Sequence, residues 1–429
     1  MKIFDMVADI LYAIKIKKIP VKDYCNYFFL SNNISKEDKK YVVKIVNFYV
    51  RHFMLIDFAI KDNFPLISKE DIFFYLIAYY FISFKFMKED ISVEEIDNDL
   101  LESLYTPTYV DTTSFSQKIR AFCTQNKYLE NKTLSKLEKN LLILNLPYDV
   151  FVKLHDSFSR DELNNLIKPN FQYKQALAIN INKCHLEDFV NDDRFEIVKS
   201  ENKMFDSYGI LILKQKILPS ELKEVVDGKL FVLDFSIFKA LDDINYHSFD
   251  DIMQITATSG NLCSYYSIIN NMNNGRSLAC FLDDRSLARS KALFERLGVD
   301  CETLICKELR FIKNEVEFDS KDVVICTPPN SNIGMFKRSG DVLFNFSLEI
   351  AEMRAKDVIK DYLEESSYFV KPNGRLFFMV RSFLDFETTE RIEEFVKNHP
   401  EFTLIKEKQI LSYEFNSDSL YYAILKRAS

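Results

Sequence analysis

The 429-residue sequence has no tryptophan, only 8 glycines, and no apolar run as long as a membrane span. Since a membrane-spanning helix needs about 20 consecutive apolar residues, no membrane partner is expected. The N-terminal segment M-K-I-F-D-M-V-A-D-I carries acidic residues within its apolar pattern, whereas the apolar core of a signal peptide is uninterrupted. We therefore expect a cytoplasmic protein, and we expect it to be a monomer.

Paired cysteines and clustered histidines are also missing. The 8 cysteines are scattered without a C-x-x-C pair, and the 5 histidines are spread over the chain. Zinc sites and disulfide scaffolds use short, regular spacings, so we expect neither a bound metal nor a disulfide framework.

The formal net charge of −8 and the pI near 5.4 exclude a protein that coats nucleic acid through bulk positive charge. They leave a local basic groove open.

The pattern of apolar residues changes twice along the chain. Residues 1–145 show apolar spacing of three and four, which predicts an all-α domain. Residues 146–242 alternate short β-like and helical runs, which predicts a small α+β module. Residues 243–429 alternate strands and helices, which predicts an α/β domain with a mostly parallel sheet covered on both faces. The predicted strands are 176–180, 195–198, 208–213 and 230–233 in the module, and 252–257, 277–282, 303–306, 322–326, 375–380, 402–410 and 420–425 in the last domain.

Polar residues follow two of the strands in the last domain. Asp322–Gly334 (D-V-V-I-C-T-P-P-N-S-N-I-G) is an apolar strand that runs into a Pro-Pro turn, and Gly374–Ser382 (G-R-L-F-F-M-V-R-S) is another strand that ends in polar residues. The carboxyl edge of an open α/β sheet is where such folds bind ligands. The two segments are therefore predicted to frame one site.

The residues that follow the first two strands of this domain can be compared with those that an adenosine-containing cofactor needs. Such a ligand needs a glycine-containing turn after the first strand and an acid after the second, which binds the ribose hydroxyls. Thr256–Gly260 (T-A-T-S-G) follows the first strand and Asp283 follows the second. A single glycine is a weak signal, and Asp283 with Asp284 is equally explained as the cap of the next helix. Both interpretations stay open.

Motifs in one order along the chain resemble the Sun-type, or RsmB-type, RNA cytosine-C5 methyltransferases. The segment from Ser35 (S-K-E-D-K-K-Y-V-V-K-I-V-N-F-Y-V-R) is similar to the family's NusB-like domain. Ala176–Asn180 lies where the family has an L-R-[IV]-N strand, and Gly228–Ser236 matches the stretch that ends in Q-D-x-S. The segment from Ile333 (I-G-M-F-K-R-S-G-D) follows the family's segment after its catalytic loop, and Val370–Leu376 resembles its L-K-x-G-G-x-L turn.

The resemblance implies a NusB-like RNA-binding domain over 1–145, an RNA-recognition-like module over 146–242, and a Rossmann-like methyltransferase domain with a seven-stranded sheet over 243–429. It implies S-adenosylmethionine as the cofactor and small-subunit ribosomal RNA as the partner. The family positions for cofactor binding are matched here by Thr256, Ala257, Gly260, Asp283, Glu308 and Thr327, and those for RNA binding by Lys337 and Arg338.

The sequence departs from the family at the reacting residues. The family is understood to attack C6 of cytosine with a cysteine thiolate, and a second cysteine assists release. Arg381 and Asn330 occupy these two positions. Neither side chain can form and then eliminate the covalent adduct, so no catalytic residue of the family is retained and its mechanism is expected to be lost. The loop that ends at Gly260 has also lost the family's second glycine and its lysine.

Two cysteines and one turn have alternative interpretations. Cys326 lies four residues before Asn330, where it can be imagined as a shifted nucleophile, and Cys263 lies one turn into the loop helix. Free cysteine usually packs as a small hydrophobe, so we predict that both thiols lie in the core. Thr327–Asn330 (T-P-P-N) resembles the N/D-P-P-Y/F turn of amino-group methyltransferases but lacks its aromatic residue.

Three classes of function remain. The chain is a residual or altered S-adenosylmethionine-dependent RNA methyltransferase, a non-catalytic relative that binds RNA or the ribosome, or a scaffold for protein interactions. A further question is whether Arg381 closes the pocket by pairing with an acid such as Asp283.

Overall fold

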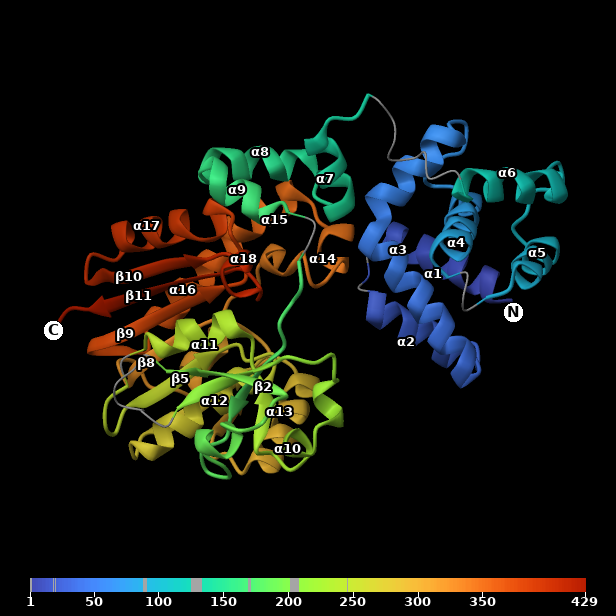
Figure 1. Cartoon of the computed structure of the whole chain (residues 1–429). Helices are drawn as coiled ribbons and strands as arrows, with labels where there is room; N and C mark the ends of the chain where they lie inside the picture. Colours follow the sequence, from blue (N-terminus) through green and yellow to red (C-terminus); the bar gives the residue numbers. More distant parts are fainter. Residues whose placement is uncertain are drawn as a thin grey trace. The chain divides into compact units, whose positions relative to one another are not determined.

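The computed structural model describes residues 2–17, 19, 21–87, 91–124, 133–168, 171–200, 208–244 and 246–429. The chain forms two compact units, Met1–Pro169 with Ser339–Phe346, and Asn170–Arg338 with Ser347–Ser429. Figure 1 follows the chain from the helices of the first unit, which begin in blue, to the strands at the red end of the second unit.

The described part of the first unit is helical, as the apolar spacing predicts. Polar caps begin several helices: Ser35 Oγ accepts from the Asp38 N–H at 3.1 Å, and Asp71 Oδ1 accepts from the Phe73 N–H at 2.9 Å. The helices are α1 (Ile3–Lys17), α2 (Val21–Ser31), α3 (Lys36–Asn63), α4 (Ile72–Phe86), α5 (Val93–Leu101), α6 (Thr112–Thr124), α7 (Lys136–Leu144), α8 (Tyr148–Ser157), α9 (Arg160–Leu166) and α14 (Asp341–Phe344).

Helix α4 lies at the centre of this unit. Every residue from Phe73 to Phe84 is buried, and a helix that is apolar all round must be enclosed by other elements. Helices α1 and α3 pack against it, and the ring of Phe4 meets that of Tyr79 edge-on at 4.6 Å. The first unit therefore has its own hydrophobic core.

The second unit begins with a small four-stranded antiparallel sheet of order β2-β3-β1-β4. The four strands confirm the predicted ones to within one residue at each end. This α+β module consists of β1 (Ala176–Ile179), η2 (Leu186–Phe189), β2 (Phe195–Lys199), β3 (Gly209–Leu213), η3 (Pro219–Glu221), α10 (Lys223–Val226), β4 (Leu230–Val232) and α11 (Phe235–Asp242).

A seven-stranded sheet of order β10-β11-β9-β8-β5-β6-β7 follows. Its five strands from β9 to β7 are parallel, while β11 pairs antiparallel with both β9 and β10. This confirms the predicted mostly parallel sheet. Its elements are β5 (Asp251–Ile255), α12 (Gly260–Met272), β6 (Arg276–Phe281), α13 (Asp284–Leu297), β7 (Glu302–Ile305), η4 (Leu309–Asn314), β8 (Lys321–Cys326), η5 (Ile333–Met335), α15 (Leu348–Arg354), η6 (Ala355–Ile359), α16 (Lys360–Ser367), β9 (Val370–Val380), η7 (Asp385–Glu387), α17 (Thr389–Asn398), β10 (Phe402–Ile410), α18 (Ser412–Phe415) and β11 (Leu420–Arg427).

Helices cover both faces of this sheet. The chain moves from β5 outward to β7 through α12 and α13, and from β8 outward in the other direction through α16 and α17. Because βαβ crossovers are right-handed, these two pairs of helices lie on opposite faces, as Figure 1 shows. One strand differs from the prediction: β9 begins at Val370, so the segment Val370–Leu376 lies within the strand, with Asn373 in the left-handed region at φ 64°.

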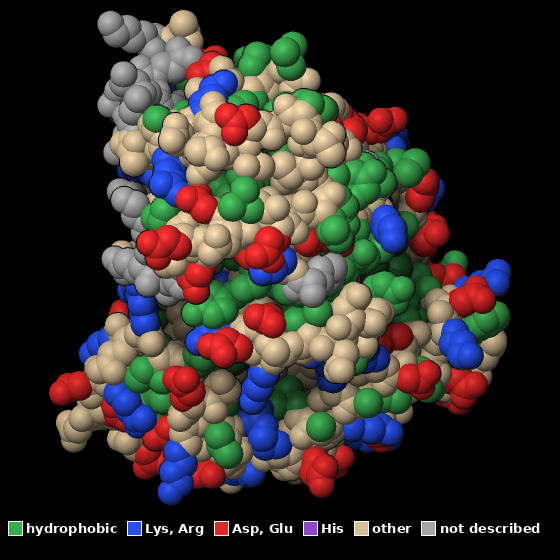
Figure 2. Space-filling model, turned by 90° about the vertical axis from the view of Figure 1, so that its right-hand side faces the viewer, with side chains coloured by type: hydrophobic (Ala, Val, Ile, Leu, Met, Phe, Trp, Pro, Cys, Tyr) green, Lys and Arg blue, Asp and Glu red, His purple; other side chains and the backbone are tan. Residues whose placement is uncertain are grey.

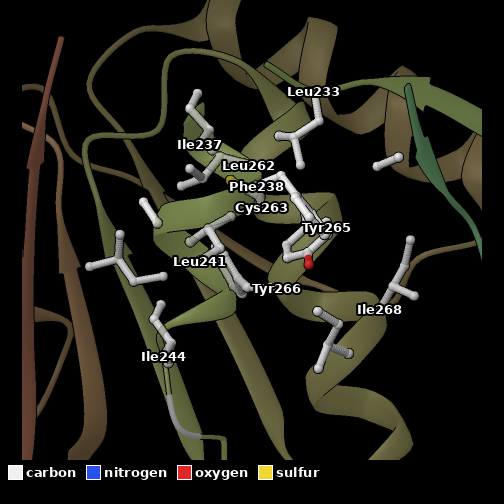
Figure 3. Close-up of a cluster of buried hydrophobic side chains, with 14 of the residues drawn as sticks. Leu233, Ile237, Phe238, Leu241, Ile244, Leu262, Cys263, Tyr265, Tyr266 and Ile268 are labelled. Atoms are coloured by element: carbon white, nitrogen blue, oxygen red, sulfur yellow. The ribbon is translucent and has the colours of Figure 1, made fainter. Parts of the chain in front are cut away.

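The module and the large sheet share one core. Side chains of α11 and α12 interlock, with Phe238 and Tyr265 meeting edge-on at a centroid distance of 6.0 Å (Figure 3). Cys263 lies in the same cluster, fully buried. The buried amide of Asn180 adds a polar link, because its Nδ2 donates to the carbonyl oxygens of Gly228 and Leu297 at 2.8 and 2.7 Å.

The surface carries mixed charge. On the face shown in Figure 2, Lys and Arg side chains are interspersed with Asp and Glu, and hydrophobic side chains lie between them. Among the residues that the structure describes, none of the helices combines the length and apolar character needed to cross a bilayer.

Candidate cofactor and substrate cavity

The main cavity of the second unit lies at the carboxyl ends of β5, β6, β8 and β9 and has a volume of about 550 Å³. This is the edge where the sequence predicted a site, and it is where open α/β sheets bind ligands. The cavity is lined by Ile237, Gln254, Thr256, Ala257, Thr258, Ser259, Leu262, Leu282, Asp283, Thr327, Pro328, Pro329, Asn330, Asn332, Arg354, Tyr362, Met379, Arg381 and Leu420.

The loop after β5 forms one wall. Thr256 has φ 59°, a left-handed conformation that a β-branched residue rarely adopts. It is held there by a hydrogen bond from its Oγ1 to the Ile255 carbonyl oxygen (2.7 Å), while the following Ala257 N–H donates to the Cys280 carbonyl oxygen (2.7 Å). Such strain is typical of functional loops. The loop places Thr256 and Ala257 at the cavity.

Gly260, at the start of α12, is not among the residues that line the cavity. A Cβ at this position would lie 3.1 to 3.2 Å from atoms of Ser290, Leu293 and Phe294 on α13. The glycine therefore allows α12 and α13 to approach closely. The N-terminus of α12 nevertheless faces the site, because Ser259 lines the cavity and makes no side-chain cap hydrogen bond.

Asp283 follows β6, caps the next helix as one of the two predictions has it, and lines the cavity. Its Oδ1 accepts from the Ser286 N–H at 2.7 Å and so caps α13. The hydrogen bond from Ser286 lowers the pKa of the Asp283 carboxyl, which therefore stays ionised. The side chain is exposed and lines the cavity, so its second oxygen can accept a hydroxyl from a ligand.

The Pro-Pro turn after β8 forms the floor. Gln254 Nε2 donates to Thr327 Oγ1 at 3.1 Å, which joins this turn to β5. The amide of Asn330 bonds within its own loop: its Nδ2 donates to the Pro328 carbonyl oxygen at 3.0 Å, and its Oδ1 accepts from the Asn332 N–H at 2.8 Å. Asn330 is thereby held against the turn while still lining the cavity.

Arg381 follows β9 and lines the opposite end of the cavity from Asp283. Its Nη1 donates to Met335 Sδ at 3.3 Å and lies 3.8 Å from Asp418 Oδ2. Its acidic neighbour is therefore Asp418 and not Asp283. Asp418 also forms a bidentate ion pair with Arg338, whose Nε and Nη2 donate to the two carboxylate oxygens at 2.9 and 2.7 Å.

Glu387 ties together the two loops that carry Asn330 and Arg381. The neighbouring Ser331 donates to Glu387 through its N–H (2.7 Å) and its Oγ (2.5 Å), and Ser382 donates through its Oγ (2.5 Å). The carboxyl is fully buried, and burial raises its pKa despite these hydrogen bonds. The positions of Asn330 and Arg381 are therefore set by one buried acid.

The remaining predicted site residues lie outside the cavity lining. Glu308 precedes η4, pairs with Arg310 at 2.7 Å, and lines a separate surface pocket. The Lys337 ammonium lies 5.1 Å from the centroid of the Phe171 ring. The guanidinium of Arg338 is directed inward to Asp418, as described above.

Both doubtful cysteines are buried, as predicted. Cys326 is fully buried, and burial raises the pKa of its thiol to about 12. Cys263 donates its thiol to Gln254 Oε1 at 2.9 Å, and burial raises its pKa as well. Neither thiol lies among the residues that line the cavity, so neither is placed as a nucleophile.

Arg354 and Tyr362 line the cavity but had no motif to mark them. Both come from the helical stretch between β8 and β9. Only their helical periodicity was visible in the sequence, and periodicity does not say which helical residues reach the sheet edge.

Many solved structures are similar to this chain, and three of them cover about two thirds of it or more. PH0851 matches with a TM-score of 0.72 and 16% identity over 99% of both chains. A methyltransferase homolog protein from Pyrococcus horikoshii matches with a TM-score of 0.55 and 15% identity, over 68% of this chain and 100% of that one. NSun6 from Pyrococcus horikoshii, whose structure was determined with SFG, matches with a TM-score of 0.56 and 11% identity, over 66% of this chain and 98% of that one.

The chain has a methyltransferase fold. The resemblance that its motifs predicted is confirmed in the fold, by the helical first unit and by the mostly parallel seven-stranded sheet. Comparisons with protein-family models and with curated proteins find no match.

Proposed function

We propose that this chain is a divergent relative of the Sun-type RNA methyltransferases that binds S-adenosylmethionine and RNA but has lost cysteine-dependent methylation of cytosine C5. One observation carries the proposal: the cavity has Asp283 at the end of β6, as an adenosine site requires, while Asn330 and Arg381 stand where the family has its thiols.

The cofactor would bind along the first two strands. The second carboxylate oxygen of Asp283 accepts the ribose hydroxyls, and Thr256, Ala257 and Thr327 contact the rest of the nucleoside. The uncapped N-terminus of α12 presents N–H groups to the carboxylate of the amino-acid part. Gly260 supports this loop through helix packing. Glu308 lines a separate surface pocket, so this cavity does not support the cofactor contact that the resemblance implies for it.

Covalent catalysis has no support in this cavity. A cysteine nucleophile must reach the base as a thiolate, yet none of the described residues that line the cavity is a cysteine. Asn330 and Arg381 cannot replace a thiolate in forming and eliminating an adduct. The family's reaction is therefore proposed to be absent, and any remaining transfer would act on a different atom.

The RNA-binding part of the proposal depends on the family resemblance. It assigns a NusB-like RNA-binding domain to 1–145, an RNA-recognition-like module to 146–242 and the methyltransferase domain to 243–429, with small-subunit ribosomal RNA as partner. The helical first unit and the four-stranded module are compatible with it. A cytoplasmic location and a monomeric state stay predictions.

Calorimetry with S-adenosylhomocysteine tests the cofactor site. We expect binding by the intact chain and about tenfold weaker binding by Asp283→Ser, because a lost charge-assisted hydrogen bond costs at least about 1.5 kcal/mol. Serine keeps a helix cap in place of Asp283, and Asp284→Ala, a charge change at the neighbouring position outside the cavity lining, is the matched control. Absence of binding by the intact chain would contradict the proposal.

A methylation assay tests the lost reaction. Labelled S-adenosylmethionine and a small-subunit ribosomal RNA fragment are expected to give no 5-methylcytosine, and an oligonucleotide with 5-fluorocytosine is expected to give no covalent complex. A trapped complex would show that a thiol outside the cavity lining reaches the base.

A second candidate is a non-catalytic relative that binds RNA or the ribosome. The buried, high-pKa thiols of Cys263 and Cys326 favour it, because they leave the cavity without a nucleophile. The absence of any methyl transfer to RNA, together with RNA binding that weakens steeply with salt, would favour this candidate. A scaffold for protein interactions would bind neither RNA nor cofactor.

A further inference from the structure

Two arginines, Arg338 and Arg381, and one buried acid, Asp418, form a cluster of which Arg381 lines the cavity. Arg338 donates to both oxygens of Asp418, at 2.9 and 2.7 Å, while Arg381 only approaches the acid, at 3.8 Å. The Asp418 side chain is 1% exposed and that of Arg381 is 30% exposed. The bidentate pair therefore takes up the charge of Asp418, and Arg381 stands between this pair and the cavity.

A second buried acid does not neutralise Arg381 either. Asp234 caps α11 by accepting from the Ser236 N–H at 3.0 Å, and it also accepts from Tyr173 Oη at 2.8 Å. A carboxylate at a helix N-terminus is compensated by that helix. Of these four charged groups, only Arg381 is among the residues that line the cavity, so its guanidinium is the charge that a ligand there would meet.

The donors of Arg381 also point to a ligand. A guanidinium has five N–H donors, and of these the structure assigns Nη1 to Met335 Sδ. The backbone of Arg381 is held rigidly, because its carbonyl oxygen accepts from the Gly334 N–H at 2.9 Å and the next residue, Ser382, is bound to Glu387. A preorganised arginine with spare donors is suited to bidentate binding of an oxyanion.

Arg381 lies far from the acid that is proposed to bind ribose. The strand order β9-β8-β5-β6 places three strand spacings, about 14 Å, between the strands that precede Arg381 and Asp283. This exceeds the Debye length of about 8 Å at physiological salt, so the two charges do not cancel. Arg354 lines the cavity too and adds a second guanidinium. The cavity thus offers an acid for hydroxyl groups at one end and the guanidinium of Arg381 for an anion at the other.

We propose that Arg381 converts the position of the family nucleophile into an anion subsite that binds a phosphate group of the RNA strand. The inference rests on the proposed function, in which the cavity binds S-adenosylmethionine and RNA. In the proposed function, the N–H groups at the start of α12 bind the carboxylate of the cofactor. A phosphate group of the RNA is therefore the anion assigned to Arg381. The carboxylate is the other source of the same chemistry, and the experiment separates the two.

The test uses the full chain and a single-stranded RNA 10-mer that contains cytidine, with affinity measured from 50 to 300 mM NaCl. We expect Arg381→Ala to bind about tenfold more weakly at low salt and to lose about 0.7 from the magnitude of the log–log salt slope, as for one phosphate contact on a single strand. Arg381→Lys should restore the slope but only part of the affinity, because lysine keeps the charge without the bidentate geometry.

Arg310→Ala is the matched control, since it removes the same charge from the surface pocket beside Glu308. Binding of S-adenosylhomocysteine and of 5′-methylthioadenosine, which lacks the carboxylate, is measured for each variant. Equal affinity of Arg381→Ala and the intact chain for both ligands, together with weaker RNA binding, supports the phosphate assignment and shows that the variant is folded.

Two results would overturn it. Weaker binding of S-adenosylhomocysteine but not of 5′-methylthioadenosine by Arg381→Ala, with RNA binding unchanged, would assign the arginine to the cofactor carboxylate. If Arg381→Ala binds RNA with the same affinity and the same salt slope as Arg310→Ala, Arg381 does not form an anion subsite. Failure of the intact chain to bind either adenosine compound would instead contradict the proposed function, and the RNA measurement would still decide the role of Arg381.

Discussion

The hydroxyl of Ser382 donates to Oε2 of Glu387 at 2.5 Å. The hydroxyl of Ser331 donates to the same oxygen, also at 2.5 Å. Each serine follows a position where the family resemblance expects a reactive cysteine, Asn330 in one loop and Arg381 in the other. One buried carboxyl thus holds two loops that are about 50 residues apart in sequence, and its protonation is linked to the stability of the site.

The stability contributed by Glu387 is expected to fall as the pH rises. Burial raises its pKa in the folded state, so the folded chain binds the proton more tightly than the unfolded chain does. The contribution is fully present below the usual glutamate pKa of about 4.3 and is lost as the pH rises through the raised value. Glu387→Gln does not titrate. The free energy of unfolding of the natural chain, relative to this variant, should therefore decrease as the pH rises above about 4.3.

Urea unfolding at several pH values measures this difference, and Glu390→Gln, at an exposed position three residues later, provides the control. A difference between the natural chain and Glu387→Gln that stays constant with pH would show that Glu387 has an ordinary pKa.

Gly334→Ala is expected to destabilise the second unit by about 2 kcal/mol or more. A Cβ at Gly334 would collide with the carbonyl oxygen of Ser419 and would lie 2.9 Å from that of Arg381. The Gly334 N–H donates to the Arg381 carbonyl oxygen, and the Gly334 carbonyl oxygen accepts from the Ser419 N–H, so a shift at this position moves the backbone of Arg381 at the cavity wall. Chemical unfolding measures the loss. Gly298→Asn should be tolerated, because asparagine accepts the left-handed conformation found there (φ 66°); equal losses for the two variants would contradict the packing argument.

Asn180→Ala is expected to cost about 3 kcal/mol. The substitution leaves the buried carbonyl oxygens of Gly228 and Leu297 without the amide that donates to both, and each unsatisfied buried group costs about 1–3 kcal/mol. The substitution removes a polar link between the small sheet and α13. Denaturant unfolding measures it against Asn182→Ala at an exposed position two residues later. A loss no larger than that of the control would show that solvent reaches the Asn180 site.

Cys263 and Cys326 are expected to resist alkylation in the native protein. Both are fully buried, and burial raises the pKa of the Cys326 thiol to about 12, so almost no thiolate forms at pH 8. Iodoacetamide labelling followed by peptide mass spectrometry should leave both unmodified, while the same protein in denaturant should be labelled at both. Rapid labelling of Cys326 in the native protein would contradict its burial and would support its interpretation as a shifted nucleophile.

Much of the second unit could be predicted from local sequence. Short apolar runs bounded by polar residues identified the strands, and their alternation with helices predicted the parallel sheet. The carboxyl-edge rule then placed Thr256, Asp283 and Thr327 in one cavity, because parallel strands end at the same edge. Glu308 follows the same rule in sequence, but the chain turns away after β7, and its side chain faces another pocket.

The sequence by itself determined the order of strands and helices along the chain, the presence of Asn330 and Arg381 where the family resemblance expects cysteines, and the edge of the sheet where polar residues collect, since all three depend on residue identity and local periodicity. Only the tertiary structure decided that Arg381 lies beside Asp418 and not beside Asp283, and that Glu387 joins Ser331 to Ser382. The physical reason is that buried polar groups must find partners wherever the folded chain brings them, and sequence distance does not reveal which partner that is.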